Sequence, residues 1–445
     1  MRNVADHMPE TSDGASGLVA AVAELALRVG VVMISSAAAA SEAAQAMLRI
    51  SEAAGVEGAT VDVNYSALLF SRTDASGQPY TRIATIGGRV FNYGRLTAIL
   101  HVVERFCRGE LTVAQAQAEA ARVDAATGPW PWWLTRLAWG FAGGSAGLIF
   151  GGNWLVVLTA FAANVLLDYL FGLLTRRQWP VFFIQLVAGF IGVLAALAAH
   201  TIDAHANPSI VVIAVIIVML AGMTTTGAIQ DAITGWYMTG IGRILEAVTN
   251  TVGLIAGVKL GLILSDRIGV KLAITASVSQ RTLQLWVMLI AAALIAIGFS
   301  FAAQNPRRII PPVALLSAAA YAVDVAGVRG NYGPIWSAAA ASFLAGAVAV
   351  AYGHRWKVAT TAAATCAILP MLPGVQLYQG LTQSTHQLTT LVTAAATALA
   401  LGGGMIFGEY IGTVVRRLFR LADDPFYTPL FADPIALHQR QTPAP

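Results

Sequence analysis

Apolar residues run almost continuously from residue 134 to residue 413, whereas many of the acids and bases lie in residues 1–128. A helix that crosses a bilayer needs about 20 predominantly apolar residues. The pattern therefore predicts a water-soluble N-terminal region followed by a multi-span membrane region. Ten segments are candidate spans: 134–151, 153–174, 180–200, 208–226, 244–264, 284–303, 310–327, 333–352, 357–373 and 386–413.

The first region combines helical and strand patterns. Apolar residues recur at three- and four-residue spacing through 17–54, and Gly30 and the pair Ser35 and Ser36 suggest a break in this helical stretch. A second helix is expected to begin near Ser41, whose side chain can cap its first turn. The alternation in ATVDVNYSALLF predicts one half-buried strand, and YTRIATI predicts the strand that returns from it in a hairpin.

Two more helices are expected after the hairpin. The first is amphipathic and covers 92–108, and the second starts at Thr112, which forms a capping-box pattern with Gln115. Together these elements predict a small cytoplasmic α+β domain over 17–128. The polar residues 1–16 before it are expected to be a disordered lead.

Composition supports the membrane assignment. The chain has 445 residues, of which 57% are hydrophobic and 11% charged, whereas a soluble protein has about 25% charged residues. This small number of charged residues cannot cover a water-facing surface. The chain is therefore predicted to be an integral membrane protein with the lipid bilayer as a partner. The net charge of +4 includes no dense basic run, so no nucleic-acid partner is expected. Cys107 and Cys366 lie in different regions, so no disulfide is expected. Trp130, Trp132 and Trp133 are expected at the headgroup level.

Basic residues in the short loops predict the orientation. If the N-terminal region is cytoplasmic, eleven Lys and Arg residues fall on the inner side and four on the outer side. This count favours both termini in the cytoplasm, including the C-terminal tail 414–445. Three of the four exceptions lie in 265–283, so the orientation of that segment stays open.

Two of the expected spans are interrupted by polar residues. ILPMLPGVQLYQGLT at 368–382 contains two prolines and a glycine, and VMLAGMTTTGAIQDAITG at 218–235 carries a matching polar stretch. Each interruption ends the fourth span of a half when the spans are grouped as five plus five. A five-span unit repeated in tandem must sit in opposite orientations. The predicted fold class is therefore mainly α: a polytopic membrane protein with about ten transmembrane helices as a 5+5 inverted repeat, with halves 129–265 and 266–413.

The interruptions also predict a binding site. Unpaired backbone groups in a bilayer cost several kcal/mol each, so they persist only where they are buried in protein or line a wet cavity. Freed backbone groups and half-helix ends could bind a zwitterionic amino acid. A pair of simple proline kinks is the alternative. The substrate-binding candidates are Thr224, Thr225, Thr226, Gly227, Gln230, Pro373, Gly374, Gln376, Tyr378 and Gln379.

Charged residues inside spans are functional candidates because each costs about 2.5–3.5 kcal/mol on insertion scales. Lys259 lies deep in the fifth span and is expected to need a carboxylate partner or to titrate low. A structural Lys–carboxylate pair is the alternative to a functional role. Asp231 lies just past the first interruption and is the first candidate for sensing a substrate ammonium or a coupling proton. The candidates for proton coupling or intramembrane charge are Asp231, Asp168, Lys259, Asp324 and Asn164, the last sharing a helix face with Asp168.

Ordinary explanations are favoured for the other polar residues. Glu246 and Glu409 lie near inner-side arginines and are interpreted as interfacial ion pairs. His200 and His205 with Asp203 are too few ligands for a metal site. No metal and no cofactor are therefore expected.

The order of these patterns resembles the threonine/serine exporter family (ThrE-like) over residues 18–413. The resemblance rests on LALRVGVVMISS, SEAAQAMLRISEAAG, the two hairpin strands, FNYGRLTAILHVVERFCRGELTVAQA and ILPMLPGVQLYQGL. Leu372, Pro373 and Gly374 are its most specific part. The first-half counterpart reads MTTTG, without the Pro-Gly often found there in the family. The resemblance implies export of threonine and serine, driven by the proton motive force, across a prokaryotic plasma membrane.

Two other function classes stay open at this point. A membrane-anchored enzyme would use the N-terminal region, but 17–125 has no G-x-S-x-G motif and no metal-ligand spacing. Cys107 and His101 lie six positions apart rather than three or four, so they do not form a dyad on their helix. A channel would pass its substrate without saturation. The exact substrate, the coupling ion and the oligomeric state, a homo-oligomer included, are not determined by the sequence.

Overall fold

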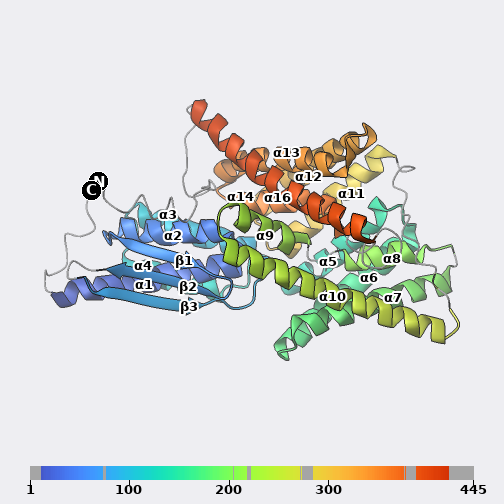
Figure 1. The fold of residues 1–445 in the computed structure, drawn as a ribbon, viewed down its shortest axis with the longest axis horizontal. Coiled ribbons are helices and arrows are strands. Elements are labelled where there is room, and N and C mark those ends of the chain that lie inside the picture. Colours follow the sequence, from blue (N-terminus) through green and yellow to red (C-terminus); the bar gives the residue numbers. More distant parts are fainter. Residues whose placement is uncertain are drawn as a thin grey trace.

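The chain forms an N-terminal α/β unit, residues 12–125, beside a larger helical region that begins at residue 132 (Figure 1). The computed structural model describes residues 12–73, 77–203, 205–217, 222–270, 272, 284–374, 376 and 387–419. The N-terminal unit contains α1 (Ser12–Ser35), α2 (Ala40–Ala53), β1 (Ala59–Val63), β2 (Ala67–Thr73), β3 (Pro79–Thr85), α3 (Tyr93–Cys107) and α4 (Val113–Ala125).

The sheet of this unit is antiparallel, in the order β1-β2-β3, and Phe70 of β2 lies opposite Val61 and Arg82. The stretch that was predicted to be one strand is two, because the chain turns after β1 and the Asn64 N–H donates to the Ala67 carbonyl at 2.9 Å. The expected hairpin is therefore β2 and β3, with β1 added at one edge.

The helices of the unit follow the prediction with two corrections. Helix α1 runs through Gly30 and ends at Ser35, so the predicted break lies at the serine pair. A side chain at Gly30 would collide with Met47 Sδ at 2.6 Å and Leu68 Cδ1 at 2.8 Å. This glycine permits close packing rather than ending a helix. Helix α2 begins at Ala40, one residue before the expected Ser41. The capping box of Thr112 with Gln115 is confirmed.

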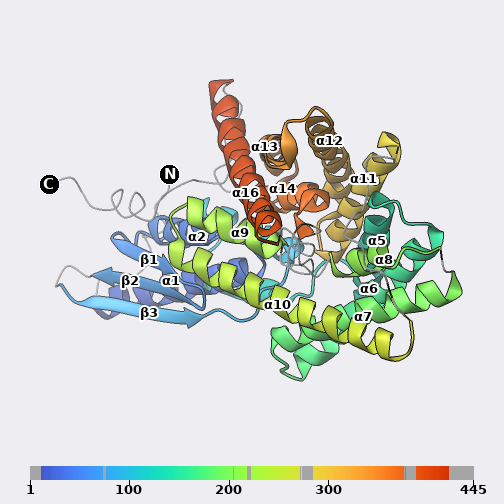
Figure 2. The ribbon, with the colours of Figure 1, turned by 45° about the vertical axis from the view of Figure 1, so that its right-hand side comes forward.

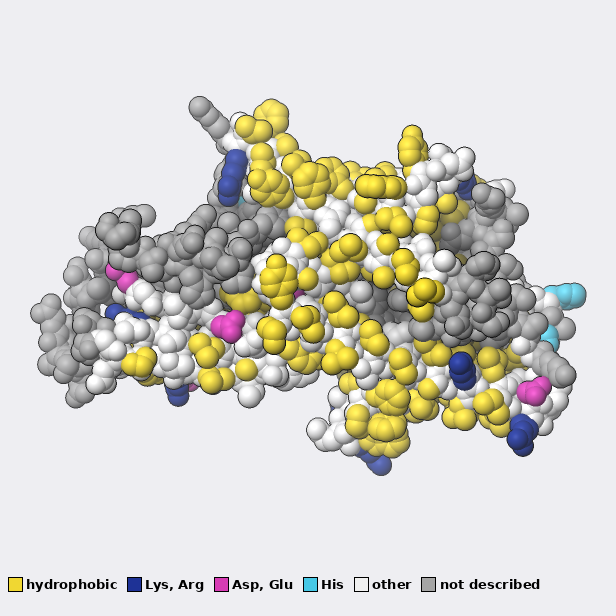
Figure 3. Space-filling view, viewed as in Figure 1, with side chains coloured by type: hydrophobic (Ala, Val, Ile, Leu, Met, Phe, Trp, Pro, Cys, Tyr) yellow, Lys and Arg dark blue, Asp and Glu magenta, His cyan; other side chains and the backbone are white. Residues whose placement is uncertain are grey.

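The helical region follows in chain order. Its elements are α5 (Trp132–Ile149), α6 (Trp154–Arg176), α7 (Val181–Ile202), α8 (Pro208–Ile216), α9 (Gly222–Ile233), α10 (Tyr237–Arg267), α11 (Leu285–Ala302), η2 (Arg307–Ile309), α12 (Ile310–Arg329), α13 (Gly333–Trp356), α14 (Thr360–Ile368), η3 (Leu369–Met371) and α16 (Gln387–Leu418). Hydrophobic side chains cover much of the visible surface of this region (Figure 3). The chain is a multi-pass membrane protein.

Eight helices in the described part of the chain are long and apolar enough to cross a membrane. Seven of them coincide with predicted spans. The eighth is Gly17–Ser35 within α1, a segment that was predicted to belong to the water-soluble region. Its apolar residues are explained by packing, because α2, α3, α4, β2 and β3 all contact α1 and 61% of its most apolar window is buried.

Both predicted interruptions coincide with helix ends. The fourth predicted span consists of α8 and α9, and the ninth consists of α14 followed by the 3₁₀ turn η3, after which Leu372 is extended. One expectation is wrong in detail: Thr224, Thr225 and Thr226 lie inside helix α9 rather than in an unwound stretch.

Two pairs of helices pack through glycines. On α10, Gly253, Gly257 and Gly261 face α7, and a Cβ on Gly257 would lie 1.9 Å from the Leu186 carbonyl oxygen. On α16, Gly408 faces α13 in the same way, with 2.1 Å to the Phe343 carbonyl oxygen. Small residues at four-residue spacing let membrane helices approach closely.

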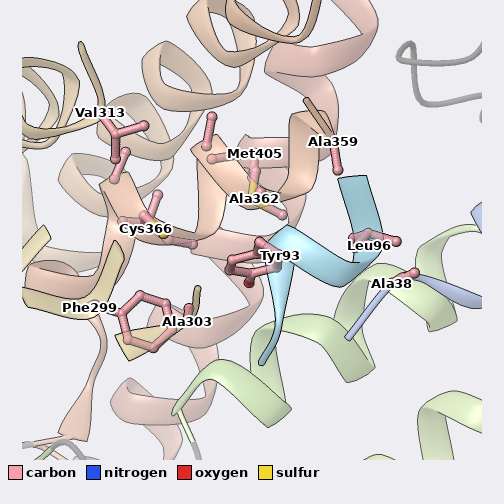
Figure 4. Packing of buried hydrophobic residues seen from close by; sticks show 14 of the residues in the cluster. Ala38, Tyr93, Leu96, Phe299, Ala303, Val313, Ala359, Ala362, Cys366 and Met405 are labelled. Carbon is pink, nitrogen blue, oxygen red and sulfur yellow. The ribbon is translucent and has the colours of Figure 1, made fainter. Parts of the chain in front are cut away.

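The N-terminal unit contacts the helical region on the side where α10 begins and where α11, α13 and α16 end (Figure 2). The Thr239 hydroxyl donates to the Val63 carbonyl at 2.8 Å, and the Tyr93 N–H donates to the Ala303 carbonyl at 2.8 Å. Tyr93 is 1% exposed and lies among residues of α14 and α16, including Ala362, Cys366 and Met405 (Figure 4). The unit thus contributes a side chain to the interior of the helical region.

Replacement of Gly257 by alanine should destabilise the protein, because the added methyl group overlaps a backbone carbonyl that cannot move without separating α7 from α10. Overpacking of this kind costs about 1–3 kcal/mol. Thermal unfolding of the purified protein in detergent measures the loss. The matched control is Gly172→Ala on α6, where no atom lies within 4 Å of the added Cβ. Equal melting temperatures for the two variants would contradict the packing described here.

Candidate functional site

A polar cavity of about 90 Å³ lies where the N-terminal unit meets α9, α10, α14 and α16. A buried water needs about 10–15 Å³ of such space, so the cavity has room for several water-sized groups. Its walls are Ala37, Arg89, Val90, Phe91 and Tyr93 from the N-terminal unit, Thr224, Thr226, Gly227 and Gln230 from α9, Arg243 and Glu246 from α10, Thr361 and Thr365 from α14, and Met405 from α16. The cavity therefore combines both signs of charge with several hydroxyl groups.

Part of the predicted substrate site lies on this cavity. Thr224, Thr226, Gly227 and Gln230 line it, and Thr226 and Gln230 are buried. Thr225 is partly buried on the same helix and does not line the cavity. Gly227 leaves space for the Arg243 guanidinium, since a Cβ there would lie 2.9 Å from Nη1.

Asp231 lies next to the cavity and is fully buried. Its carboxylate forms an ion pair with Arg243 Nη1 at 2.9 Å and accepts the Ala40 N–H at 2.9 Å. Arg243 Nη2 also donates to the Ala38 carbonyl at 3.1 Å. The positive N-terminal end of α2 and a guanidinium thus both face this carboxylate, which stabilises its charged form. The pair joins α9 and α10 to the N-terminal unit.

The second interruption lies away from the polar cavity. Pro373 and Gly374 are buried and Gln376 is partly buried, but none of them lines the cavity in the described part of the chain. Tyr378 and Gln379 lie outside the described residues. Residues from the regions of the two interruptions do meet elsewhere. A second cavity of about 30 Å³ is lined by Ile217, Leu369, Pro370 and Leu372 together with apolar residues of α5 and α11. The space between the interruptions is apolar there, and the polar space lies toward the N-terminal unit.

The other predicted charges are dispersed. Asp168 of α6 forms an ion pair with Arg136 of α5 at 3.2 Å in a part-exposed position. Asn164 is fully buried and donates to the Ala160 carbonyl at 2.9 Å. Asp324 is partly buried in α12. None of Asp168, Asn164 and Asp324 is among the described residues that line the polar cavity.

Lys259 does not meet the expected partner. It is exposed on the outer surface of α10, and no carboxylate within the described ranges lies within salt-bridge distance of it. The face of this turn that packs against α7 carries Gly257 and Gly261, and Lys259 lies outside that contact.

Several site residues were missed or misinterpreted from sequence. Arg243 was counted only as a basic loop residue, and Arg89, Thr361 and Thr365 were not noticed. Nothing local marks them, because they come from three segments far apart in the chain that meet only in the folded protein. Glu246 was interpreted as an interfacial ion pair, yet it lines the cavity.

Glu409 also contradicts its sequence interpretation as an interfacial ion pair. It is 0% exposed in the middle of α16, and neither carboxylate oxygen has a hydrogen-bond partner among the described residues. Its carboxylate interacts electrostatically with Glu42 of α2. Glu42 is half-buried, and its carboxylate accepts the Ala39 N–H at 3.4 Å.

Glu42 and Arg89 are among the groups of the N-terminal unit whose pKa values differ from the ordinary ones. Burial raises the pKa of Glu42 from 4.5 to about 7, with a further increase from nearby Asp231 and an opposing effect of Arg243. Burial lowers the pKa of Arg89, and repulsion from Arg243 lowers it further. Two guanidinium groups therefore lie close enough to repel, and an anion between them would relieve this repulsion.

Comparison with known proteins identifies the family. Residues 24–265, more than half of the chain, match the ThrE model of threonine/serine exporters. The chain belongs to the threonine/serine exporter family. A second model, "Threonine/Serine exporter, ThrE", matches residues 288–415. Family membership makes the chain a transporter of the exporter class and not an enzyme.

Two relatives in this exporter family are similar over most of their length. "Probable threonine/serine exporter" of Mycobacterium tuberculosis is 29% identical over 444 residues, which cover 95% of this chain and 84% of the relative. "Threonine/serine exporter" of Corynebacterium glutamicum is 27% identical over 414 residues, which cover 90% and 84%. No solved structure matches the chain.

Loss of the Asp231 charge should cost far more stability than loss of the Asp168 charge. Asp231→Asn leaves Arg243 buried without a counter-charge, and breaking a buried pair costs about 3–5 kcal/mol. Asp168→Asn removes a part-exposed pair, which is worth about 1 kcal/mol or less. Chemical unfolding of both variants in the same detergent gives the comparison. Similar losses for the two variants would show that the Asp231–Arg243 pair does not hold the junction together.

Proposed function

We propose that this chain is a secondary transporter that exports small polar amino acids, threonine and serine, driven by the proton motive force. The observation that carries the proposal is the polar cavity beside the interrupted fourth span, with unsatisfied donors of the kind an amino acid needs. Arg89 Nε and Arg243 Nε are buried and have no hydrogen-bond partner among the described residues, and the Thr361 hydroxyl lies close to the Glu42 carboxylate. A buried polar group without a partner costs about 1–3 kcal/mol, so a bound ligand would recover that energy.

The cavity suggests a binding mode. The substrate carboxylate lies between Arg89 and Arg243, where it separates two like charges and can accept charge-assisted hydrogen bonds. The substrate ammonium faces Glu246 and Gln230. The substrate hydroxyl reaches Thr361, with Thr226 and Thr224 on the opposite wall from α9. This mode uses side chains where the sequence interpretation relied on backbone groups.

The roles of the remaining predicted residues stay part of the proposal. Pro373 and Gly374 follow the 3₁₀ turn that ends the second broken helix, and they stay substrate-binding candidates together with Gln376, Tyr378 and Gln379. Asp231 holds Arg243 and the N-terminus of α2 in place, and we retain it as a candidate for sensing the substrate or the coupling proton. Asp168, Asn164, Asp324 and Lys259 are retained only as intramembrane charges or polar groups outside the cavity.

Internal symmetry supports a 5+5 inverted repeat. GLIAGVKLG at 253–261 and GMIFGEYIG at 404–412 share the same glycine spacing, and each packs on the third helix of its half. The first helices of the halves, α5 and α11, run antiparallel: Trp139 contacts Phe299, while Trp130 near the start of α5 contacts Phe301 near the end of α11. Antiparallel pairing of equivalent helices is what inverted halves require.

The proposed orientation places the N-terminal unit and both termini in the cytoplasm of a prokaryotic plasma membrane. Arg136, Arg243, Arg307 and Lys357 lie at helix ends on the same side as the N-terminal unit, as the positive-inside rule expects. Substrate would then enter the cavity from the cytoplasm, and contacts of Ala38 and Ala40 with the Asp231–Arg243 pair would close that side. Outward release would follow when the halves rock about the site.

Proteoliposomes loaded with labelled threonine test the function. Wild-type protein should release the label with saturable kinetics when the outside is made acidic. Thr361→Val should raise the KM for threonine roughly fivefold to tenfold, because one ligand hydrogen bond of about 1 kcal/mol is lost. The control Thr249→Val, on the exposed face of α10, should leave the KM unchanged.

Non-saturating release that ignores the proton gradient would instead establish a channel. An unchanged KM in Thr361→Val would remove that residue from the proposed site. Thermal unfolding distinguishes these outcomes from misfolding, since a misfolded Thr361→Val variant would also lose its cooperative unfolding transition.

A further inference from the structure

We propose that Glu42 of α2 and Glu409 of α16 together hold the coupling proton, so that the N-terminal unit contributes a proton-binding residue to transport. This inference rests on the proposed proton-driven export. Neither residue was a proton-coupling candidate from the sequence. Neither lines the polar cavity, but Glu42 lies near Thr361 and Arg243 of its wall, and Glu409 lies one turn beyond Met405.

Burial gives the first argument. Glu409 is 0% exposed, and both of its oxygens are without a hydrogen-bond partner in the described part of the chain. An ionised carboxylate in such a place is strongly disfavoured, so the side chain holds a proton unless a positive group approaches. It lies one turn beyond Met405, which lines the cavity. A change in the cavity can therefore reach this carboxyl group directly.

The first half of the proposed inverted repeat gives an internal control. In the alignment of GLIAGVKLG with GMIFGEYIG, Val258 occupies the position of Glu409. Val258 is also 0% exposed, and the neighbouring glycines make the same close contacts to the facing helix. Helix packing at this position is thus satisfied by an apolar residue. The carboxyl group of Glu409 serves something other than packing.

Glu42 supplies the exchange partner. Its carboxylate interacts with that of Glu409, and both cannot easily be ionised together, so the two titrate as a pair. The other charged or titratable groups facing Glu42 are Asp231, Arg243 and Tyr93. The pKa of Glu42 of about 7 lies close to physiological pH, where a small change in its surroundings transfers a proton.

The proton also affects the contact that closes the cavity. Protonated Glu42 leaves Asp231 as the anion beside Arg243 and the Ala40 N–H, and the N-terminus of α2 stays docked. Ionised Glu42 repels Asp231 and competes for Arg243, which weakens docking. Because the pKa is raised relative to 4.5, docking is strongest below about pH 4.5 and weakens as the pH rises through 7. Proton release to the cytoplasm would thus open the cavity toward the substrate.

The experiment compares two activities of reconstituted protein. Counterflow exchanges labelled for unlabelled threonine without a proton gradient, whereas net efflux is driven by an imposed gradient. We expect Glu42→Gln and Glu409→Gln to keep counterflow within about threefold of wild type and to lose at least tenfold of the gradient stimulation. Glutamine imitates the protonated acid in size and lack of charge. Glu52→Gln, at an exposed site on the same helix, should keep both activities.

Three results would overturn the inference. Gradient-stimulated efflux of wild-type size in either variant would show that the residue carries no coupling proton. Parallel loss of counterflow and efflux would show a role in folding or binding instead. Absence of saturable counterflow in wild-type protein would overturn the proposed function itself, before any variant is made.

A second measurement does not depend on transport. Infrared difference spectra of wild-type protein between pH 6 and pH 8 should contain a carboxylic-acid C=O band that disappears in Glu42→Gln. A wild-type spectrum without that band, or an unchanged band in the variant, would contradict a proton on this pair.

Discussion

The buried ion pair between Asp231 and Arg243 is the interaction on which the junction depends. Two opposite charges are removed from water at a point where a broken span, a long span and the N-terminal unit meet. Such a pair is stable only when the remaining hydrogen-bonding groups find partners. The Ala40 N–H and the Ala38 carbonyl satisfy one group on each side of the pair, and both belong to the N-terminal unit. The charge pair thus makes docking of that unit a condition for a satisfied membrane interior.

The same constraint explains why the polar cavity lies beside the N-terminal unit and not between the interruptions. The interruptions meet around a small apolar cavity lined by Ile217, Leu369 and Pro370. Polar groups concentrate instead where the N-terminal unit covers them. The helix pairs α7–α10 and α13–α16 pack closely through their glycines. Such close contact leaves little space for water or substrate between the helices of each pair.

Much of the architecture could be predicted from the sequence. Apolar runs located the spans, and the proline- and glycine-containing stretch located the second broken helix. Thr226 and Gln230 could be singled out because polar residues at membrane depth are costly and therefore informative, and both line the polar cavity. Errors came from patterns that do not report direction: Lys259 was expected to need a carboxylate partner although it is exposed on α10, and Gly30 was interpreted as a helix break although it permits a tight packing contact.

The remaining site residues could not be predicted because their significance comes from neighbours distant in the chain. Arg89 and Glu42 belong to a region that looks self-contained in sequence, and nothing local connects them to α9 or α16. Glu409 lies near arginines in the chain, which favoured an ion pair, whereas the helix turns its carboxyl group into the protein interior.

Tyr93 shows that the two parts of the chain are not independent modules. Its ring fills space between α14 and α16, and its N–H bonds to the last turn of the helical region's sixth predicted span. Severing the chain after α4 would leave an apolar hole, an exposed carbonyl and an orphaned guanidinium in the remaining fragment. A truncated membrane fragment would therefore be a different molecule from the intact exporter, and its behaviour would say little about how the whole protein works.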